Sequence, residues 1–118
     1  MRLFVYGTLK RGGCNHRHLH GQRFIAEAST QARYRLFDLG GYPGMVLDET
    51  EGRSIEGEIW EVDAACLRLL DLLEDTEGGE YLREPIPLCP PHADWSVEGY
   101  RYLRSVAGFA DIGNCWRE

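Results

Sequence analysis

The chain of 118 residues is 43% hydrophobic and 27% charged, which is typical of a folded globular protein and excludes a disordered one. Its length favours a single domain over residues 1–118, because domains cluster near about 100–150 residues. A formal net charge of −6 argues against a nucleic-acid partner, since binding a polyanion depends on Lys and Arg side chains that neutralise its phosphates.

The first element expected is a buried strand at Leu3–Tyr6, an apolar run that ends at Gly7. Nothing in this stretch resembles the long apolar region of a signal peptide, and no apolar run approaches the about 20 residues that cross a bilayer. The four cysteines lie too far apart for a metal knuckle or a redox pair. We therefore expect a cytoplasmic protein with reduced thiols and no membrane partner.

The loop that follows this strand, Gly7–Gly13, is rich in glycine and carries two cations. Residues 1–26 contain five Lys and Arg residues and no acid, so this segment carries +5 and the rest of the chain −11, for a total of −6. A small anion would be drawn to this end. The loop has neither P-loop nor dinucleotide-binding spacing. Two interpretations stay open: its backbone N–H groups converge on one oxygen atom, or it is a plain surface turn.

Three histidines come next, at His16, His18 and His20. A metal site usually recruits a further carboxylate or thiolate, and the single nearby candidate is Cys14. A nucleophile pair of Cys14 and His18 lacks a third group to orient it. The cluster is therefore interpreted as a solvated basic patch, and no metal site is predicted.

Further along the chain, apolar runs and alternating patterns separated by Gly and Pro predict more strands. They are expected at Tyr34–Phe37, Met45–Leu47, Ser54–Val62, Tyr81–Leu88 and Val97–Val106. Pro85 and Pro87 mark the Tyr81–Leu88 strand as an edge, because proline cannot donate to a neighbouring strand. Short strands in an order that does not alternate with helices predict an α+β fold with a mostly antiparallel or barrel-like sheet.

One amphipathic helix is expected after Asp63, which is a suitable N-cap residue. Its apolar positions, Cys66, Leu67, Leu69, Leu70 and Leu73, fall at the spacing of one helix face, and paired glycines at Gly78 and Gly79 end it. Glu74 lies beside the apolar face, where desolvation would suit a carboxyl group for general acid/base chemistry. On composition alone, the opposing interpretation of a solvated surface acid is favoured.

Taken together, several stretches resemble the γ-glutamyl cyclotransferase-like family, which includes the γ-glutamylamine cyclotransferases. They occur in order along nearly the whole chain: VYGTLKRGGCN at 5–15, Gly41–Val46, Ile55–Val62, Leu70–Glu74, Tyr81–Arg83 and Gly113–Trp116. The most specific feature is the Tyr-Gly-Thr-Leu loop combined with a Glu at the end of a helix. The resemblance implies a compact mixed β-barrel with flanking helices. It also implies an enzyme that releases 5-oxoproline from a small-molecule γ-glutamyl substrate without a cofactor.

The resemblance also implies site residues. Glu74 would be the catalytic acid/base, and the substrate-binding residues would be Tyr6, Gly7, Thr8, Leu9, Asn15, Tyr81 and Tyr102, with Tyr100 as an alternative to Tyr102. For Asn15 and Arg83, ligand contact and loop bracing are both open. Asp75 departs from the family, in which glycine commonly follows the catalytic Glu. The leaving amine and the oligomeric state stay open, and a carboxylate-binding domain without turnover is the alternative function.

Overall fold

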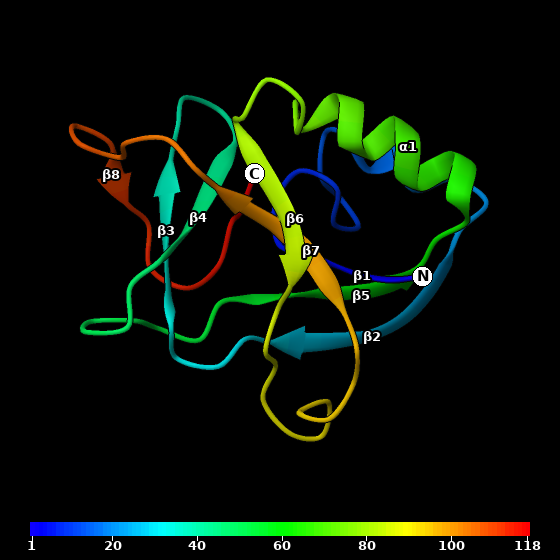
Figure 1. The fold of residues 1–118 in the computed structure, drawn as a ribbon, viewed down its shortest axis with the longest axis horizontal. Coiled ribbons are helices and arrows are strands. Elements are labelled where there is room, and N and C mark those ends of the chain that lie inside the picture. The colour runs from blue at the N-terminus through cyan, green and yellow to red at the C-terminus, as the bar shows by residue number, and fades with distance from the viewer.

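The structure is a computed structural model that describes residues 1–118, and its strands form two sheets (Figure 1). The larger sheet has the order β2-β5-β1-β7-β6 and the smaller one the order β4-β3-β8. The strands of the larger sheet are β1 (Arg2–Val5), β2 (Arg23–Ser29), β5 (Glu56–Glu61), β6 (Tyr81–Pro85) and β7 (Glu98–Tyr102). Those of the smaller sheet are β3 (Tyr34–Asp38), β4 (Pro43–Leu47) and β8 (Ala110–Asp111). The helices are the 3₁₀ helix η1 (His16–Leu19) and the α-helix α1 (Ala64–Leu73).

The α+β class is confirmed, but the closed barrel implied by the resemblance is not found. The larger sheet ends in the free edges β2 and β6, and the smaller sheet ends in β4 and β8. Pro85 lies at the end of β6 and Pro87 follows it, so this strand pairs with β7 on one side only, as predicted for an edge. In place of several flanking helices, the fold has one α-helix and one 3₁₀ turn.

Strand β1 lies at the centre of the larger sheet, antiparallel to β5 and parallel to β7. Leu3, Phe4 and Val5 are almost completely buried, as predicted for this run. Successive side chains of a strand point to opposite faces, so Leu3 and Val5 join one hydrophobic cluster while Phe4 joins the other. The loop after Val5 therefore leaves the sheet between two packed layers.

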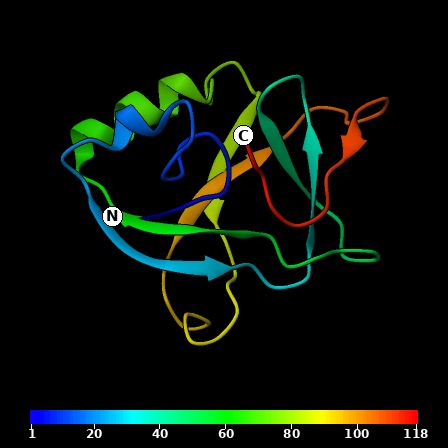
Figure 2. The ribbon, with the colours of Figure 1, turned by 180° about the vertical axis from the view of Figure 1, so that it is seen from behind.

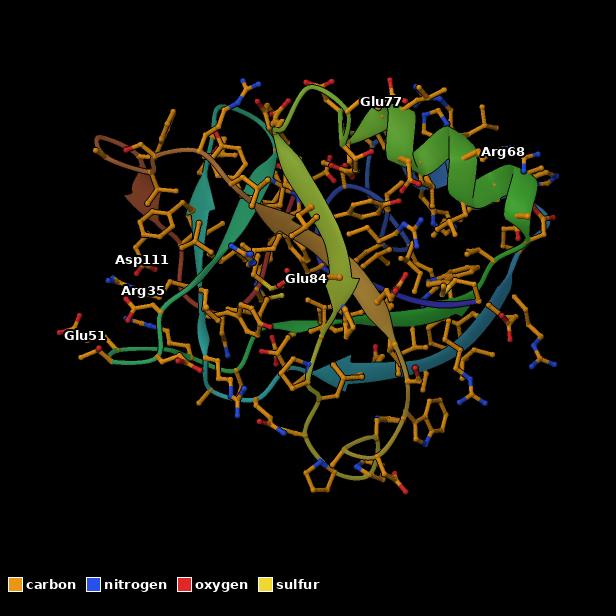
Figure 3. The ribbon with its side chains drawn as sticks, in the orientation of Figure 1. Arg35, Glu51, Arg68, Glu77, Glu84 and Asp111 are labelled. Atoms are coloured by element: carbon orange, nitrogen blue, oxygen red, sulfur yellow. The ribbon has the colours of Figure 1, made fainter.

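Strand β2 was not predicted, although it forms one edge of the larger sheet along β5 (Figure 2). Its residues are mostly half-buried, and a register shift between Phe24 and Ala26 interrupts the alternation on which a sequence-based assignment depends. In the smaller sheet, Arg35 on β3 forms an ion pair with Asp111 on β8, and Figure 3 shows these two side chains together. This contact ties the C-terminal segment to the fold.

Helix α1 begins as predicted, because the Asp63 side chain accepts a hydrogen bond of 2.7 Å from the backbone N–H of Cys66. The predicted apolar face is only partly right. Cys66 and Leu70 are buried, but Leu69 is 62% exposed and Leu73 is 42% exposed. The helix ends at Leu73, before the glycines that were expected to end it. No helix of the structure is both long and apolar enough to cross a membrane.

Candidate active site

A small cavity lies where the loop after β1 meets the C-terminal end of α1 and strands β6 and β7. In Figures 1 and 2, this loop appears in dark blue beneath the end of the helix. The wall of the cavity consists of Phe4, Val5, Tyr6, Gly7, Thr8, Leu9, Tyr42, Pro43, Glu74, Tyr81 and Tyr100. The structure therefore brings the predicted catalytic residue, the predicted loop and Tyr81 to one place.

The loop uses its carbonyl groups and leaves three amide groups free. The carbonyl of Gly7 accepts from Lys10 N–H at 3.1 Å, and the carbonyl of Thr8 accepts from Asn15 N–H at 3.0 Å. The N–H groups of Gly7, Thr8 and Leu9 donate to no other group of the protein. Consecutive unpaired N–H groups form a concave site of positive potential, which suits a carboxylate or an oxyanion.

Asn15 braces this loop. Its side-chain Nδ2 donates to Thr8 Oγ1 at 3.0 Å, in addition to the backbone bond to the same residue. Asn15 does not line the cavity itself. It lines a second, more open hollow next to the cavity, which is described below. Of the two roles that the sequence left open for Asn15, loop bracing is the one that its hydrogen bonds display.

Glu74 is the only carboxyl group on the cavity wall. It lies at the C-cap of α1, where its backbone N–H donates to the carbonyl of Leu70. Its carboxylate has no hydrogen bond or ion pair with another residue. Burial, and to a lesser degree the negative charge of Glu80, raises the pKa of Glu74 to about 7. Near neutral pH the group is therefore present in both its acid and its base form.

The tyrosine hydroxyls of the wall are already engaged. Tyr6 donates to the carbonyl of Tyr100 at 2.8 Å and accepts from the N–H of Met45 at 3.2 Å, and Tyr81 donates to the carbonyl of Pro43 at 2.7 Å. Burial raises the pKa of Tyr6, and that of Tyr81, well above the ordinary value. These residues present rings to the cavity, which leaves Glu74 as the group able to exchange protons near neutral pH.

The hydroxyl of Tyr100 joins a charged network outside the cavity. It donates to Asp71 Oδ1 at 2.8 Å, and Arg83 holds both oxygens of Asp71, at 2.9 and 3.2 Å. Arg83 also donates to Glu98 on β7. Arg83 therefore braces the structure and does not line the cavity. Asp71 precedes Glu74 by less than one helical turn, so the network fixes the end of α1 relative to the sheet.

Tyr102 does not line the cavity, in contrast to the expectation that it supplies a pocket ring. It pairs with Tyr81 across β6 and β7, and the two rings make an edge contact with their centroids 5.2 Å apart. Tyr100, the alternative that the sequence left open, occupies the wall.

An outer hollow adjoins the cavity and shares Thr8, Tyr42, Glu74 and Tyr81 with it. Its other side chains include Leu73 and Glu80, and Glu80 accepts a hydrogen bond of 3.1 Å from the hydroxyl of Tyr42. The inner cavity has room for a small group beside the free amides.

The histidine cluster does not form a metal site, because no group of three His, Cys, Asp or Glu side chains is arranged to hold an ion. His16 is half-buried and hydrogen-bonded instead of solvated, so the interpretation as a solvated patch is wrong for this residue. Its Nδ1 donates to the carbonyl of Leu9 at 2.9 Å, and its ring packs edge-on against Trp60. His20 is exposed.

Sequence patterns also failed to indicate Glu58, the least exposed acidic residue of the chain. It occupies a polar position in the alternating pattern of the predicted strand Ser54–Val62, so the pattern itself predicted a solvated side chain. The loop after β1 covers it instead: Glu58 accepts from Arg11 and from the indole of Trp60. No local signal reveals that partnership, which joins residues 47 positions apart.

Comparisons with known proteins show the family and the fold of the chain. A model of the γ-glutamyl cyclotransferase, AIG2-like family matches residues 3–116. The γ-glutamylcyclotransferase family protein YtfP of Escherichia coli K12 is 36% identical over 108 residues, which are 92% of this chain and 88% of that protein. The solution structure of Escherichia coli ytfP gives a TM-score of 0.71 and covers 98% of this chain and 95% of that one. The crystal structure of a mouse AIG2-like protein gives a TM-score of 0.68 at 33% identity, over 88% of this chain and 76% of that one.

Proposed function

Because the chain belongs to the γ-glutamyl cyclotransferase, AIG2-like family, we propose that it is a γ-glutamyl cyclotransferase that releases 5-oxoproline from a γ-glutamyl amine or a γ-glutamyl amino acid. One observation carries the proposal: a carboxyl group whose pKa is about 7 shares a small cavity with three unpaired backbone N–H groups. The first can move protons, and the others can hold negative oxygen. Both functions are needed for ring closure at a γ-glutamyl amide.

In the proposed complex, the γ-glutamyl group occupies the inner cavity in a curled conformation. The N–H groups of Gly7, Thr8 and Leu9 bind its carboxylate or the oxygen of the reacting carbonyl. Ring closure is intramolecular, so holding the α-nitrogen about 3 Å from the γ-carbon contributes several kcal/mol by positioning alone. The tyrosine rings around the cavity exclude water from the folded substrate.

Glu74 handles the proton transfers. The α-nitrogen attacks the γ-carbonyl carbon, a new C–N bond closes the lactam, and the C–N bond to the departing amine breaks. Overall, two protons leave the α-ammonium and two arrive at the departing nitrogen, which goes free as an ammonium ion. The Glu74 carboxylate accepts a proton from the first nitrogen and returns it to the second. Only protons and one acyl group are transferred, so the reaction requires no redox cofactor.

The test is a panel of γ-glutamyl amides and γ-glutamyl amino acids incubated with the protein, with 5-oxoproline as the measured product. We expect release from at least one compound, and we expect Glu74→Gln to lower kcat/KM by at least about 100-fold while the protein still binds 5-oxoproline. Asp75→Asn is the matched control, because Asp75 is the exposed neighbour of Glu74 and its charge faces Arg104. This control should retain activity.

Two outcomes would contradict the proposal. If wild-type protein binds 5-oxoproline or γ-glutamyl compounds but converts none of a broad panel, the alternative of a carboxylate-binding domain replaces it. If Glu74→Gln is as active as wild type, the proton transfers take place elsewhere and the role given to Glu74 is wrong.

A further inference from the structure

We infer that Glu58 and His16, two residues outside the cavity, are positioning residues that fix the loop after β1 so that its free amides face the substrate. The inference rests on the proposed function, because it concerns the same loop and the same ligand. It adds two residues that neither the loop sequence nor the position of the catalytic carboxyl group indicates. Neither residue lines the cavity.

Glu58 binds the second half of the loop, at Arg11. Its side chain is buried, with 7% of the residue exposed, and it accepts three hydrogen bonds. Oε1 accepts from the backbone N–H of Arg11 at 3.0 Å and from Trp60 Nε1 at 3.1 Å, and Oε2 accepts from Arg11 Nε at 3.0 Å. A buried carboxylate satisfied in this way is costly to disturb, because any lost partner leaves charge unpaired.

His16 binds the first half of the loop, at Leu9. The bond from its Nδ1 to the Leu9 carbonyl requires the tautomer with hydrogen on Nδ1. The ring is kept in place by Trp60, whose centroid lies 5.3 Å away in an edge contact. Trp60 donates to Glu58, so the two supports are connected through one side chain on β5.

These supports determine which groups of the loop remain free. The peptide group between Leu9 and Lys10 is bound at both ends, through the Leu9 carbonyl and the Lys10 N–H. The next peptide group is also bound at both ends, because the Lys10 carbonyl accepts from Gly13 and the Arg11 N–H donates to Glu58. With these planes fixed, the preceding amides have no competing partner within the loop. Their direction is set before the substrate arrives, which is the condition for effective oxyanion binding.

The experiment measures binding of 5-oxoproline by calorimetry and thermal unfolding in parallel, on wild type and four variants. Glu58→Gln keeps the size of the side chain but cannot accept all three bonds as a carboxylate, and His16→Ala frees the Leu9 carbonyl. We expect each to raise the Kd for 5-oxoproline by about tenfold, the effect of losing one hydrogen bond to a charged group. His16 is half-buried, so His16→Ala tests the claim even if Glu58→Gln fails to fold.

Two matched controls accompany them. Glu27→Gln removes the exposed carboxylate that also contacts Arg11, at 3.3 Å, and His20→Ala removes an exposed histidine of the same cluster. Both should leave the Kd within about twofold of wild type, because surface contacts of this kind contribute little. In amide NMR spectra, addition of 5-oxoproline should shift the signals of Gly7, Thr8 and Leu9 in wild type, and less so in the two test variants at equal ligand concentration.

The inference is overturned if Glu58→Gln or His16→Ala lowers the unfolding temperature without changing the Kd, which is the result for residues with a purely structural role. It is also overturned if the controls weaken binding as much as the test variants do. A wild-type protein that neither binds 5-oxoproline nor forms it would refute the proposed function itself. That result is distinct from selective failure of the two positioning variants.

Discussion

At the scale of single residues, two acids on the same helix differ in their environment. Asp71 accepts from Arg83 and Tyr100, whereas Glu74 has no donor within the protein and faces a cavity. A partnered carboxylate is stabilised in its charged form, and an unpartnered one in an apolar cavity is not. Two acids less than one helical turn apart therefore have different roles: Asp71 braces the structure, and Glu74 is suited to proton exchange.

This difference predicts how Glu74 affects stability as the pH changes. The pKa of Glu74 is raised to about 7 in the folded protein from 4.5, so its protonated form favours folding. That contribution is fully present below pH 4.5 and is lost as the pH rises through 7. Glu74→Gln never carries the charge, so its stability relative to wild type should grow between pH 4.5 and 7 by about 3 kcal/mol, at 1.36 kcal/mol per unit of pKa.

The measurement is urea unfolding of wild type and Glu74→Gln at a series of pH values. The difference between the two free energies of unfolding isolates Glu74, because the other titrating groups cancel. A difference that stays constant from pH 4 to pH 8 would mean that Glu74 is solvated in the folded protein.

Not all residues of the site were equally accessible to sequence analysis. Glu74 could be found because its position at the end of an amphipathic helix is a local pattern, and because the loop motif supports it. Glu58 and His16 could not be found in this way. Glu58 lies 47 positions from the loop residue that it binds, and the sequence of the histidine cluster indicated a solvated patch. From sequence alone, an acidic residue at a polar position of a strand is predicted to be exposed. Only the tertiary structure shows that a loop covers it.

At the scale of elements, the loop after β1 is held so closely that it has no room for a side chain at Gly13. A Cβ atom added there would lie 2.2 Å from the carbonyl oxygen of Thr8, which is backbone and cannot rotate away. The loop must therefore change its path to accept any larger residue. The glycine preserves the turn that lets the Thr8 carbonyl face Asn15.

We predict that Gly13→Ala raises the Kd for 5-oxoproline by at least about tenfold and lowers stability by about 1–3 kcal/mol, the usual cost of forced backbone shifts. Calorimetry and urea unfolding measure the two effects. Gly21→Ala is the control: Gly21 has a φ of +82° but open space around it, so this change should cost about 1 kcal/mol without affecting binding. Equal binding by wild type and Gly13→Ala would show that the loop path does not matter for the ligand.

The elements themselves were predicted where the sequence carries a strong local signal. The cap at Asp63, the central strand β1 and the proline-marked edge strand β6 all have such signals. Strand β2 lacks one, because its register shift and half-exposed side chains hide the alternation. The exposure of Leu69 and Leu73 was also unpredictable, since only tertiary packing determines which side of a leucine-rich helix is covered.

At the scale of the whole molecule, the site depends on segments that are far apart in the sequence. The first strand supplies the amide-rich loop, the helix supplies Glu74 from its C-terminal end, and β6 and β7 supply the tyrosine rings. Strand β1 lies at the centre of the larger sheet and contributes to both hydrophobic clusters, so the loop that follows it starts next to the core. The site residues that the family resemblance implies include Glu74, the loop after β1 and Tyr81, which line one cavity, and Tyr102, which does not line it. The resemblance also implied a closed barrel that the strand pairing does not form.

The most direct test is the titration of the Glu74 side-chain carboxyl, followed by carbon-13 NMR in the folded protein without ligand. We expect a midpoint near pH 7, because the carboxyl group is buried in the cavity without a partner and lies near Glu80. A midpoint near the ordinary value of 4.5 would place the carboxyl group in water and rule out Glu74 as the acid/base of the site.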